Sequence, residues 1–205
     1  MFLAKKIRLR PNEEQEKQLW KSVGTARFIY NWTLNKQEEH YKNGGQFISD
    51  GILRKELTQL KKSELSWLND VSNNVAKQAV KDACDAYRRF FKGLADKPKF
   101  KRRKTSKPSF YNDNVKLKAK QNSVLIEKVG WVRTAEQVPM DCQYRNPRIS
   151  FDGKYWYLSV GVEQAQQPIE LTDETIGIDM GIKDLAVCSN GIVIKNINKT
   201  AKVRK

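Results

Sequence analysis

The sequence predicts an α+β protein: a small antiparallel β-barrel with an inserted helical region, followed by a separate group of strands. Three observations lead to this prediction. A strand-like segment, Phe2–Arg10, stands before a long region in which apolar residues recur at helical spacing. Several short segments of alternating apolar and polar residues follow at the spacing of a barrel. A last alternating run, Thr175–Val187, comes after a segment with the composition of a linker, Gln164–Asp173.

The first segment, Phe2–Arg10, predicts a strand with basic residues on one side. Pro11 and Asn12 end this strand, because proline cannot donate to a ladder. A strand that precedes the helices and belongs with the later strands helps to close the barrel. Its candidate phosphate contacts are Lys5, Arg8 and Arg10.

The region after Pro11 predicts three helices. Asn12 and Gln15 resemble a capping box, which opens a helix that continues to about Tyr41. Helical spacing returns with Leu53, Leu57 and Leu60, which predict a second helix. The third helix follows residues 70–73 and carries one apolar stripe: Ala76, Val80, Ala83, Tyr87, Phe90 and Leu94. Such stripes predict a shared helical core.

Two hypotheses place DNA against the predicted helices. A helix–turn–helix reader in residues 13–60 is one alternative, although the connection at Gly44 and Gly45 is longer than the usual turn. The other concerns the start of the third helix, where backbone N–H groups attract phosphate and Asn or Gln can read adenine. Its candidate contacts are Ser72, Asn73, Asn74, Lys77, Gln78 and Lys81. An ordinary solvent-facing helix surface is the alternative.

A strongly basic stretch begins after Asp96. From Lys97 to Lys120 there are ten Lys or Arg residues and a single acid, Asp113. We expect this stretch to form no core and to bind nucleic acid, with cations on phosphates and rings on bases. A solubilising linker is the alternative. The candidate contacts are Lys99, Lys101, Arg102, Arg103, Lys104, Phe110 and Tyr111.

Short strands are predicted through the second half of the chain. They are Val115–Lys120, Val124–Lys128, Trp131–Arg133, Arg148–Phe151 and Tyr155–Val162. Asp152-Gly153 and Asn190-Gly191 predict two hairpin turns. The apolar residues around the second turn are typical of a sheet buried on both faces, but the sequence offers no further strands or helices to cover them, so we expect these side chains either to dock on another surface or to remain exposed. Asn196–Lys205 is expected to be a disordered tail.

Composition limits the function classes. The 39 Lys and Arg against 23 Asp and Glu give a formal net charge of +16, which favours nucleic acid and, second, an anionic membrane surface. With no bilayer-length apolar run and no signal peptide, we expect a soluble cytoplasmic protein. Cys84, Cys142 and Cys188 form no CxxC pair, which argues against a zinc ribbon within this chain. His40 is the single histidine, so a histidine-based site is not expected.

Asp179 is the strongest candidate for metal chemistry. It is predicted in the middle of a strand, on the face where Gly177 and Gly181 leave room. A carboxylate there is costly to bury unless it is compensated, and a divalent metal is the usual compensation. A strand acid satisfied by a neighbouring loop is the alternative.

An ordered set of sequence pieces covers nearly the whole chain. The pieces are KIRLRPNEEQEKQL, GTARFIYNWTL, YRRFFKG, PKFKRRK, SF, GKYWYLSV and IGIDMGIKDLAV with SNG. This set resembles the TnpB (OrfB) proteins of insertion sequences, which are related to small type V CRISPR nucleases. The last piece is similar to the first acidic strand of a ribonuclease H-like (RuvC) nuclease.

The resemblance implies a domain order. A wedge barrel would comprise the first strand at residues 1–10 and the segment at residues 96–165, with a helical recognition domain at residues 11–95. The start of a RuvC-like domain would occupy residues 172–205. The implied partners are a guide RNA from the transposon end and double-stranded DNA with a short target-adjacent motif. The implied cofactor is Mg²⁺, and the matching catalytic and metal-binding position is Asp179.

The chain also departs from the family pattern. Family members carry a second catalytic Glu, a zinc ribbon and a third catalytic Asp, and none of these is found in the 205 residues. Asp184 lies at an odd offset from Asp179 and would face the other side of a strand. Asp173 and Glu174 fall in or beside the linker. We therefore expect nucleic-acid binding with an incomplete nuclease site, which leaves enzymatic activity open. The alternatives are a non-catalytic RNA- or DNA-binding regulator and a helix–turn–helix DNA-binding protein.

Overall fold

The computed structural model describes residues 2–140, 142–163 and 175–196. The chain divides into two compact units, Met1–Ala165 and Gln166–Lys205, which are considered separately. The predicted linker Gln164–Asp173, the acids Asp173 and Glu174, and residues 197–205 of the predicted tail lie outside the described residues. No described helix is both long enough and apolar enough to cross a bilayer.

The helices of the first unit follow the predicted spacing. They are α1 (Glu13–Lys42), α2 (Asp50–Leu60) and α3 (Asn73–Phe91), with a short 3-10 helix η1 (Ser66–Asp70) before α3. The predicted capping box is confirmed: the Gln15 N–H donates to Asn12 Oδ1 at 2.8 Å, and the Asn12 N–H donates to Gln15 Oε1 at 3.1 Å. The assignment of Leu94 to the third stripe is wrong, because α3 ends at Phe91 and Gly93 adopts a φ of +67°.

The strands of the first unit form one antiparallel sheet. They are β1 (Phe2–Arg10), β2 (Ser109–Tyr111), β3 (Lys118–Lys120), β4 (Ser123–Ile126), β5 (Gly130–Thr134), β6 (Tyr144–Phe151) and β7 (Trp156–Glu163). Their order is β2-β6-β7-β1-β5-β4-β3, so β1 pairs with the later strands β7 and β5 and joins the two halves of the sheet. No ladder between described residues joins β2 to β3, and closure into a barrel stays a prediction.

Strand boundaries differ from prediction inside the basic stretch. Residues 114–116 form a turn, so the predicted strand Val115–Lys120 shortens to β3. The expectation that this stretch contributes no core is also wrong. Phe110 lies opposite Ile149 in the β2–β6 ladder and is 3% exposed, and Leu117 is buried in the same core. Leu117 lies between Lys116 and Lys118, which hid it in the sequence pattern, whereas Phe110 was interpreted as a ring that stacks on a base.

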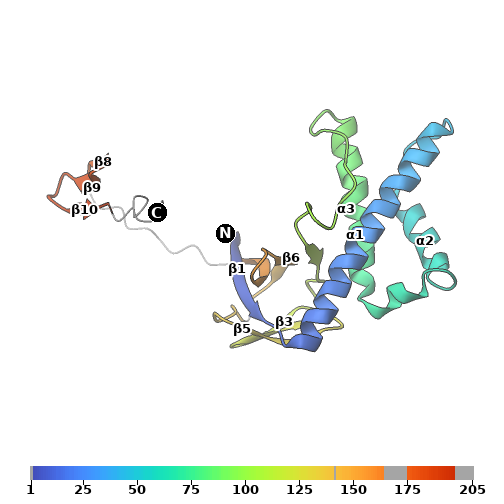
Figure 1. The fold of residues 1–205 in the computed structure, drawn as a ribbon, viewed down its shortest axis with the longest axis horizontal. Coiled ribbons are helices and arrows are strands. Elements are labelled where there is room, and N and C mark those ends of the chain that lie inside the picture. Colours follow the sequence, from blue (N-terminus) through green and yellow to red (C-terminus); the bar gives the residue numbers. More distant parts are fainter. Residues whose placement is uncertain (1, 141, 164–174, 197–205) are drawn as a thin grey trace. The chain divides into compact units, whose positions relative to one another are not determined.

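One apolar core joins the sheet to the first turns of α1. Leu19 and Val23 of α1 and Val75 of α3 pack with the inward residues of the strands, among them Ile149 and Leu158. A second core lies among the helices and includes Ile29, Leu53, Leu68 and Val80. α1 and α3 pack against each other and cross at an angle in Figure 1, and α2 packs against α3.

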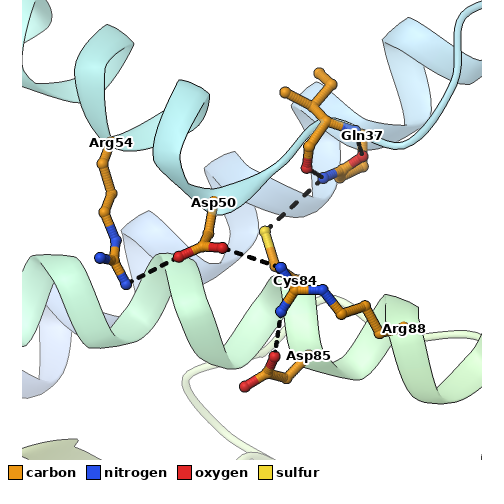
Figure 2. Close-up of polar contacts among 7 residues, drawn as sticks. Gln37, Asp50, Arg54, Cys84, Asp85 and Arg88 are labelled. Carbon is orange, nitrogen blue, oxygen red and sulfur yellow. Dashed lines mark hydrogen bonds and ion pairs between the residues drawn. The ribbon is translucent and has the colours of Figure 1, made fainter.

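A polar network links the three helices. Gln37 of α1 is fully buried; its amide donates to the Ile48 carbonyl at 2.6 Å and accepts from the Ile48 N–H at 3.0 Å. Figure 2 shows Asp50 of α2 between Arg54 and Arg88, at 3.1 and 3.0 Å. Burial opposes ionisation of Asp50, but the hydrogen bond from Arg88 and the two positive charges outweigh it and lower the pKa.

The same network contains Cys84, whose thiol is buried and accepts a hydrogen bond from Gln37 (Figure 2). Burial raises the pKa of the Cys84 thiol to about 11, although the Gln37 bond acts in the opposite direction. Cys84 is therefore a thiol at neutral pH and has a packing role.

The second unit is a three-stranded antiparallel sheet: β8 (Ile178–Met180), β9 (Asp184–Cys188) and β10 (Val193–Lys195), in the order β10-β9-β8. The predicted Asn190-Gly191 turn is confirmed, with Gly191 at a φ of +86°. Within the described residues Ala186 and Cys188 are buried, whereas the other apolar strand residues are exposed. Of the two expected outcomes, docking or exposure, the described residues therefore show exposure. The exposed set is Ile176, Ile178, Leu185, Val187, Ile192 and Ile194.

Candidate nucleic-acid interface

The basic segment, defined here as residues 97–108, is fixed to α1. The Asn31 side-chain amide donates to the Lys101 carbonyl at 2.9 Å, and the Lys101 N–H donates to Asn31 Oδ1 at 2.8 Å. Within the segment, the Arg102 N–H donates to Ser106 Oγ at 2.9 Å, and the Ser106 N–H donates to the Arg102 carbonyl at 3.0 Å. These bonds give the backbone a defined turn, which a flexible linker would lack.

The cations of this turn face solvent. Arg102, Arg103, Lys104 and Lys107 are exposed, and no ion pair involves them in the part of the chain that the structure describes. Lys99 is also exposed. Several unpaired cations on one ordered turn are the arrangement that a phosphate backbone can neutralise with release of counterions.

Lys101, unlike the exposed cations that follow it, is partly buried against α1. Its ammonium lies 4.0 Å from the centre of the Tyr30 ring, a cation–π contact on the surface of α1. Burial lowers the pKa of Lys101; the nearby Asp82 charge acts against this shift and Arg148 adds to it. Lys101 therefore anchors the segment to α1, both through its backbone and through its side chain.

The aromatic candidates of the stretch are less available than predicted. Phe110 is a core residue at 3% exposure, so its ring cannot stack on a base in this structure, and we do not retain it as a contact. Tyr111 is half-buried and its hydroxyl donates to Asn114 Oδ1 at 3.0 Å. Burial raises the pKa of Tyr111. The ring that faces solvent is Phe100 of the basic segment, at 44% exposure.

The start of α3 already holds a carboxylate. Ser72 is buried, caps α3 by accepting from the Asn74 N–H, and donates to Glu127 Oε2 at 2.5 Å. The Asn74 side-chain amide donates to the same oxygen at 3.0 Å. The Glu127 carboxylate thus already binds the side chains of both Ser72 and Asn74 and places a negative charge beside this N-terminus. We therefore do not retain Ser72 and Asn74 as nucleic-acid contacts.

The other α3 candidates differ among themselves. Asn73 Oδ1 accepts from the Lys61 ammonium at 2.7 Å, and the Gln78 amide donates to Asp82 Oδ1 at 2.8 Å. Lys77 and Lys81 are exposed on the following turns. These four remain proposals, and the two lysines are the ones with side chains open to a phosphate.

The outward face of β1 combines cations with rings that the sequence pattern did not single out. Lys6 Nζ lies 4.1 Å from the Tyr157 ring centre, and the Arg8 guanidinium lies 4.8 Å from that of Tyr155. Arg10 continues this face, whereas Lys5 has the opposite parity along the strand. The antiparallel pairing of β1 with β7 could have indicated this face, because it places Arg8 directly opposite Tyr157.

Asp179 lies in the middle of β8, as predicted, and is exposed. It pairs with Val187, so Asp184 faces the other side of this sheet, where it binds the Lys195 ammonium at 2.7 Å. No group of three or more His, Cys, Asp and Glu side chains gathers within the described ranges. The described donors therefore do not fit a two-metal centre, which needs several carboxylates around the ions.

The glycines beside Asp179 have a local explanation. A Cβ at Gly181 would lie 2.9 Å from the Asp184 carbonyl oxygen, so the turn between β8 and β9 requires glycine there. A Cβ at Gly177 would make ordinary contacts with Ser189 at 3.6 Å. Space for an ion is therefore not needed to explain Gly181.

Comparisons with known proteins agree with the sequence pieces. Residues 1–46 match the OrfB IS605 family profile that is described as a helix-turn-helix domain. The chain is 30% identical over 202 residues to InsQ of Escherichia coli K12, a protein named for RNA-guided DNA endonuclease activity; the match covers 98% of this chain and 50% of InsQ. A protein of Streptomyces pristinaespiralis with the same kind of name is 27% identical over 196 residues, covering 93% of this chain and 49% of its own length. The chain thus spans about half the length of both relatives.

The region that matches the family profile contains one strand and one uninterrupted helix. Residues 1–46 include β1 and the whole of α1, and α2 begins only at Asp50. A helix–turn–helix reader needs two helices joined by a short turn, and residues 43–49 are longer than that turn. The local geometry of these residues therefore gives no support to the helix–turn–helix alternative.

Proposed function

The chain belongs to the TnpB (OrfB) family, and on that premise we propose that it is a nucleic-acid-binding part of an RNA-guided DNA endonuclease. The observation that carries the proposal is the ordered turn of unpaired cations, Arg102, Arg103, Lys104 and Lys107, on the surface of α1. Such a turn suits the closely spaced phosphates of a folded RNA, which a flexible tail would bind with a larger loss of entropy.

The finer assignments of this proposal follow the family. The first unit would supply the wedge and recognition domains, with the sheet closed as a barrel, and the second unit would be the beginning of a RuvC-like domain. The RNA partner would be a guide from the transposon end. The DNA partner would be a duplex with a short target-adjacent motif, approached by Lys77 and Lys81 of α3.

Cleavage is not expected from the described donors. Asp179 is exposed at the matching catalytic position, but a single carboxylate cannot hold the two Mg²⁺ ions that in-line displacement uses. We therefore propose that these 205 residues bind nucleic acid without cutting it. Binding without cleavage is also what the second candidate, a non-catalytic regulator on the same scaffold, would show.

One experiment tests binding and cleavage together. The purified chain is incubated with Mg²⁺, a transposon-end guide RNA and matching duplex DNA, and complex and product are read from the same gel. We expect a salt-sensitive complex with RNA and no product. A cut at the guided position that disappears in Asp179→Ala would contradict the cleavage part. Failure to bind any structured RNA at 50 mM salt would contradict the binding part.

A further inference from the structure

A cavity of about 170 Å³ lies between α1 and the basic segment. Its α1 wall is one helix face, Trp20, Val23, Gly24 and Arg27, and its other wall is the turn that Asn31 holds in place. Four cations line it, and none of its lining residues is acidic. They are Arg27, Lys101, Arg103 and Lys107.

One aromatic ring, that of Trp20, also lines the cavity. Trp20 is 39% exposed and meets Phe151 and Trp156 edge-on, at centroid distances of 5.1 and 5.0 Å. These contacts hold in place the indole of a residue that lines the cavity. Sheet contacts thus fix the ring that a flat ligand would meet.

Gly24 gives the cavity its depth. A Cβ built on Gly24 has no heavy atom within 4 Å, and its φ is not in the left-handed region. Glycine is unfavourable inside a helix by about 1 kcal/mol relative to alanine, and here neither packing nor backbone conformation requires it. The residue leaves the helix backbone open on the side of α1 that lines the cavity.

We propose that this cavity binds one unpaired nucleotide, with its phosphate on Arg27, Arg103 and Lys107 and its base against Trp20. A flat, apolar ring beside unpaired cations is the combination that recognises single-stranded nucleic acid, because a base in a duplex has no free face to offer. The inference rests on the proposed function, which it deepens by naming an unpaired nucleotide as the ligand of this surface. Trp20, Arg27 and Lys107 were not among the residues that the sequence pattern indicated.

The test separates the contribution of the base to binding from that of the phosphates. Two fluorescent probes with equal numbers of phosphates are used: a ten-nucleotide oligouridylate and a ten-residue abasic ribose-phosphate strand. The measured quantity is the ratio of their affinities. We expect the wild-type chain to prefer the oligouridylate about tenfold, which is in the range of one stacked base. The same pair built on deoxyribose shows whether RNA or DNA supplies the nucleotide.

Gly24→Leu fills the cavity without a change of charge. The preference of this variant for the oligouridylate over the abasic strand should fall to less than about twofold. Asn35→Leu is the matched control, since Asn35 is an exposed α1 residue outside the cavity lining, and it should keep the wild-type ratio. If Gly24→Leu does not fold, Trp20→Leu should show the same loss of preference. The nucleotide site alone is overturned if the ratio of the two probe affinities is equal in the wild type and in the folded cavity variant. In that case both probes should still bind with a steep salt dependence. Failure of both probes to bind the wild-type chain also overturns the nucleotide site, and failure of structured RNA to bind as well overturns the proposed function with it.

Discussion

Replacing Arg102, Arg103, Lys104 and Lys107 together by glutamine is expected to lower affinity for structured RNA by about two orders of magnitude at 0.1 M salt. Each of these cations is exposed and free of ion pairs in the described part of the chain, so each can release a counterion on binding. The slope of log affinity against log salt should flatten by about three units, since each contact contributes about 0.7 to 0.9. Lys101 is left unchanged because it anchors the segment over Tyr30.

A variant with the same loss of charge controls for net charge. Lys17, Lys42, Lys55 and Lys62 are exposed on or beside α1 and α2 and have no ion pair among the described residues. Their joint replacement by glutamine should change the salt slope by less than about one unit. Equal losses of RNA affinity in the two variants would mean that binding depends on the net charge of +16 alone and that RNA has no preference for the ordered turn.

Asp82→Ala is expected to destabilise the first unit by about 2 kcal/mol and to lower its melting temperature by roughly 4–8 °C. Arg148 of β6 binds both Asp82 oxygens through NH2 at 2.9 Å, and this pair ties α3 to the sheet. The side chains are 24% and 34% exposed, so the penalty of an unpaired guanidinium is smaller than in a dry core.

Two further variants show whether the loss comes from the unpaired charge. Adding Arg148→Met to Asp82→Ala should recover about half of the loss, because both polar groups are then removed. Asp85→Ala on the same helix breaks the more exposed pair with Arg88 and should cost less than about 1 kcal/mol. Thermal unfolding followed by circular dichroism measures all of these. Equal costs for Asp82→Ala and Asp85→Ala would show that the Asp82 pair has no special role.

Local signals in the sequence predicted the elements. The capping box at Asn12 fixed the start of α1, and the hairpin turns at Asp152 and Asn190 fixed the pairing of their strands. Apolar spacing predicted all three helices. These features depend on residues only three or four positions apart, and short-range physics therefore suffices to find them.

The contacts that build the candidate interface could not be read in this way. Asn31 and Lys101 are 70 positions apart, and Ser72 and Glu127 are 55 apart. Nothing near Asn31 in the sequence indicates that its amide will hold a distant backbone. Phe110 is a core residue within the basic stretch, and only its register opposite Ile149 explains its burial. Side-chain partners of this kind are set by tertiary structure.

The most direct test of the account is a lysine footprint of the RNA complex. The chain is acetylated with and without structured RNA, and the modification of each lysine is measured by mass spectrometry. The account predicts that RNA protects Lys99, Lys104 and Lys107 of the basic segment, while Lys42 and Lys55 on the helices remain equally reactive. Protection of Lys42 and Lys55 to the same degree, or full reactivity of the basic segment in the presence of bound RNA, would contradict it.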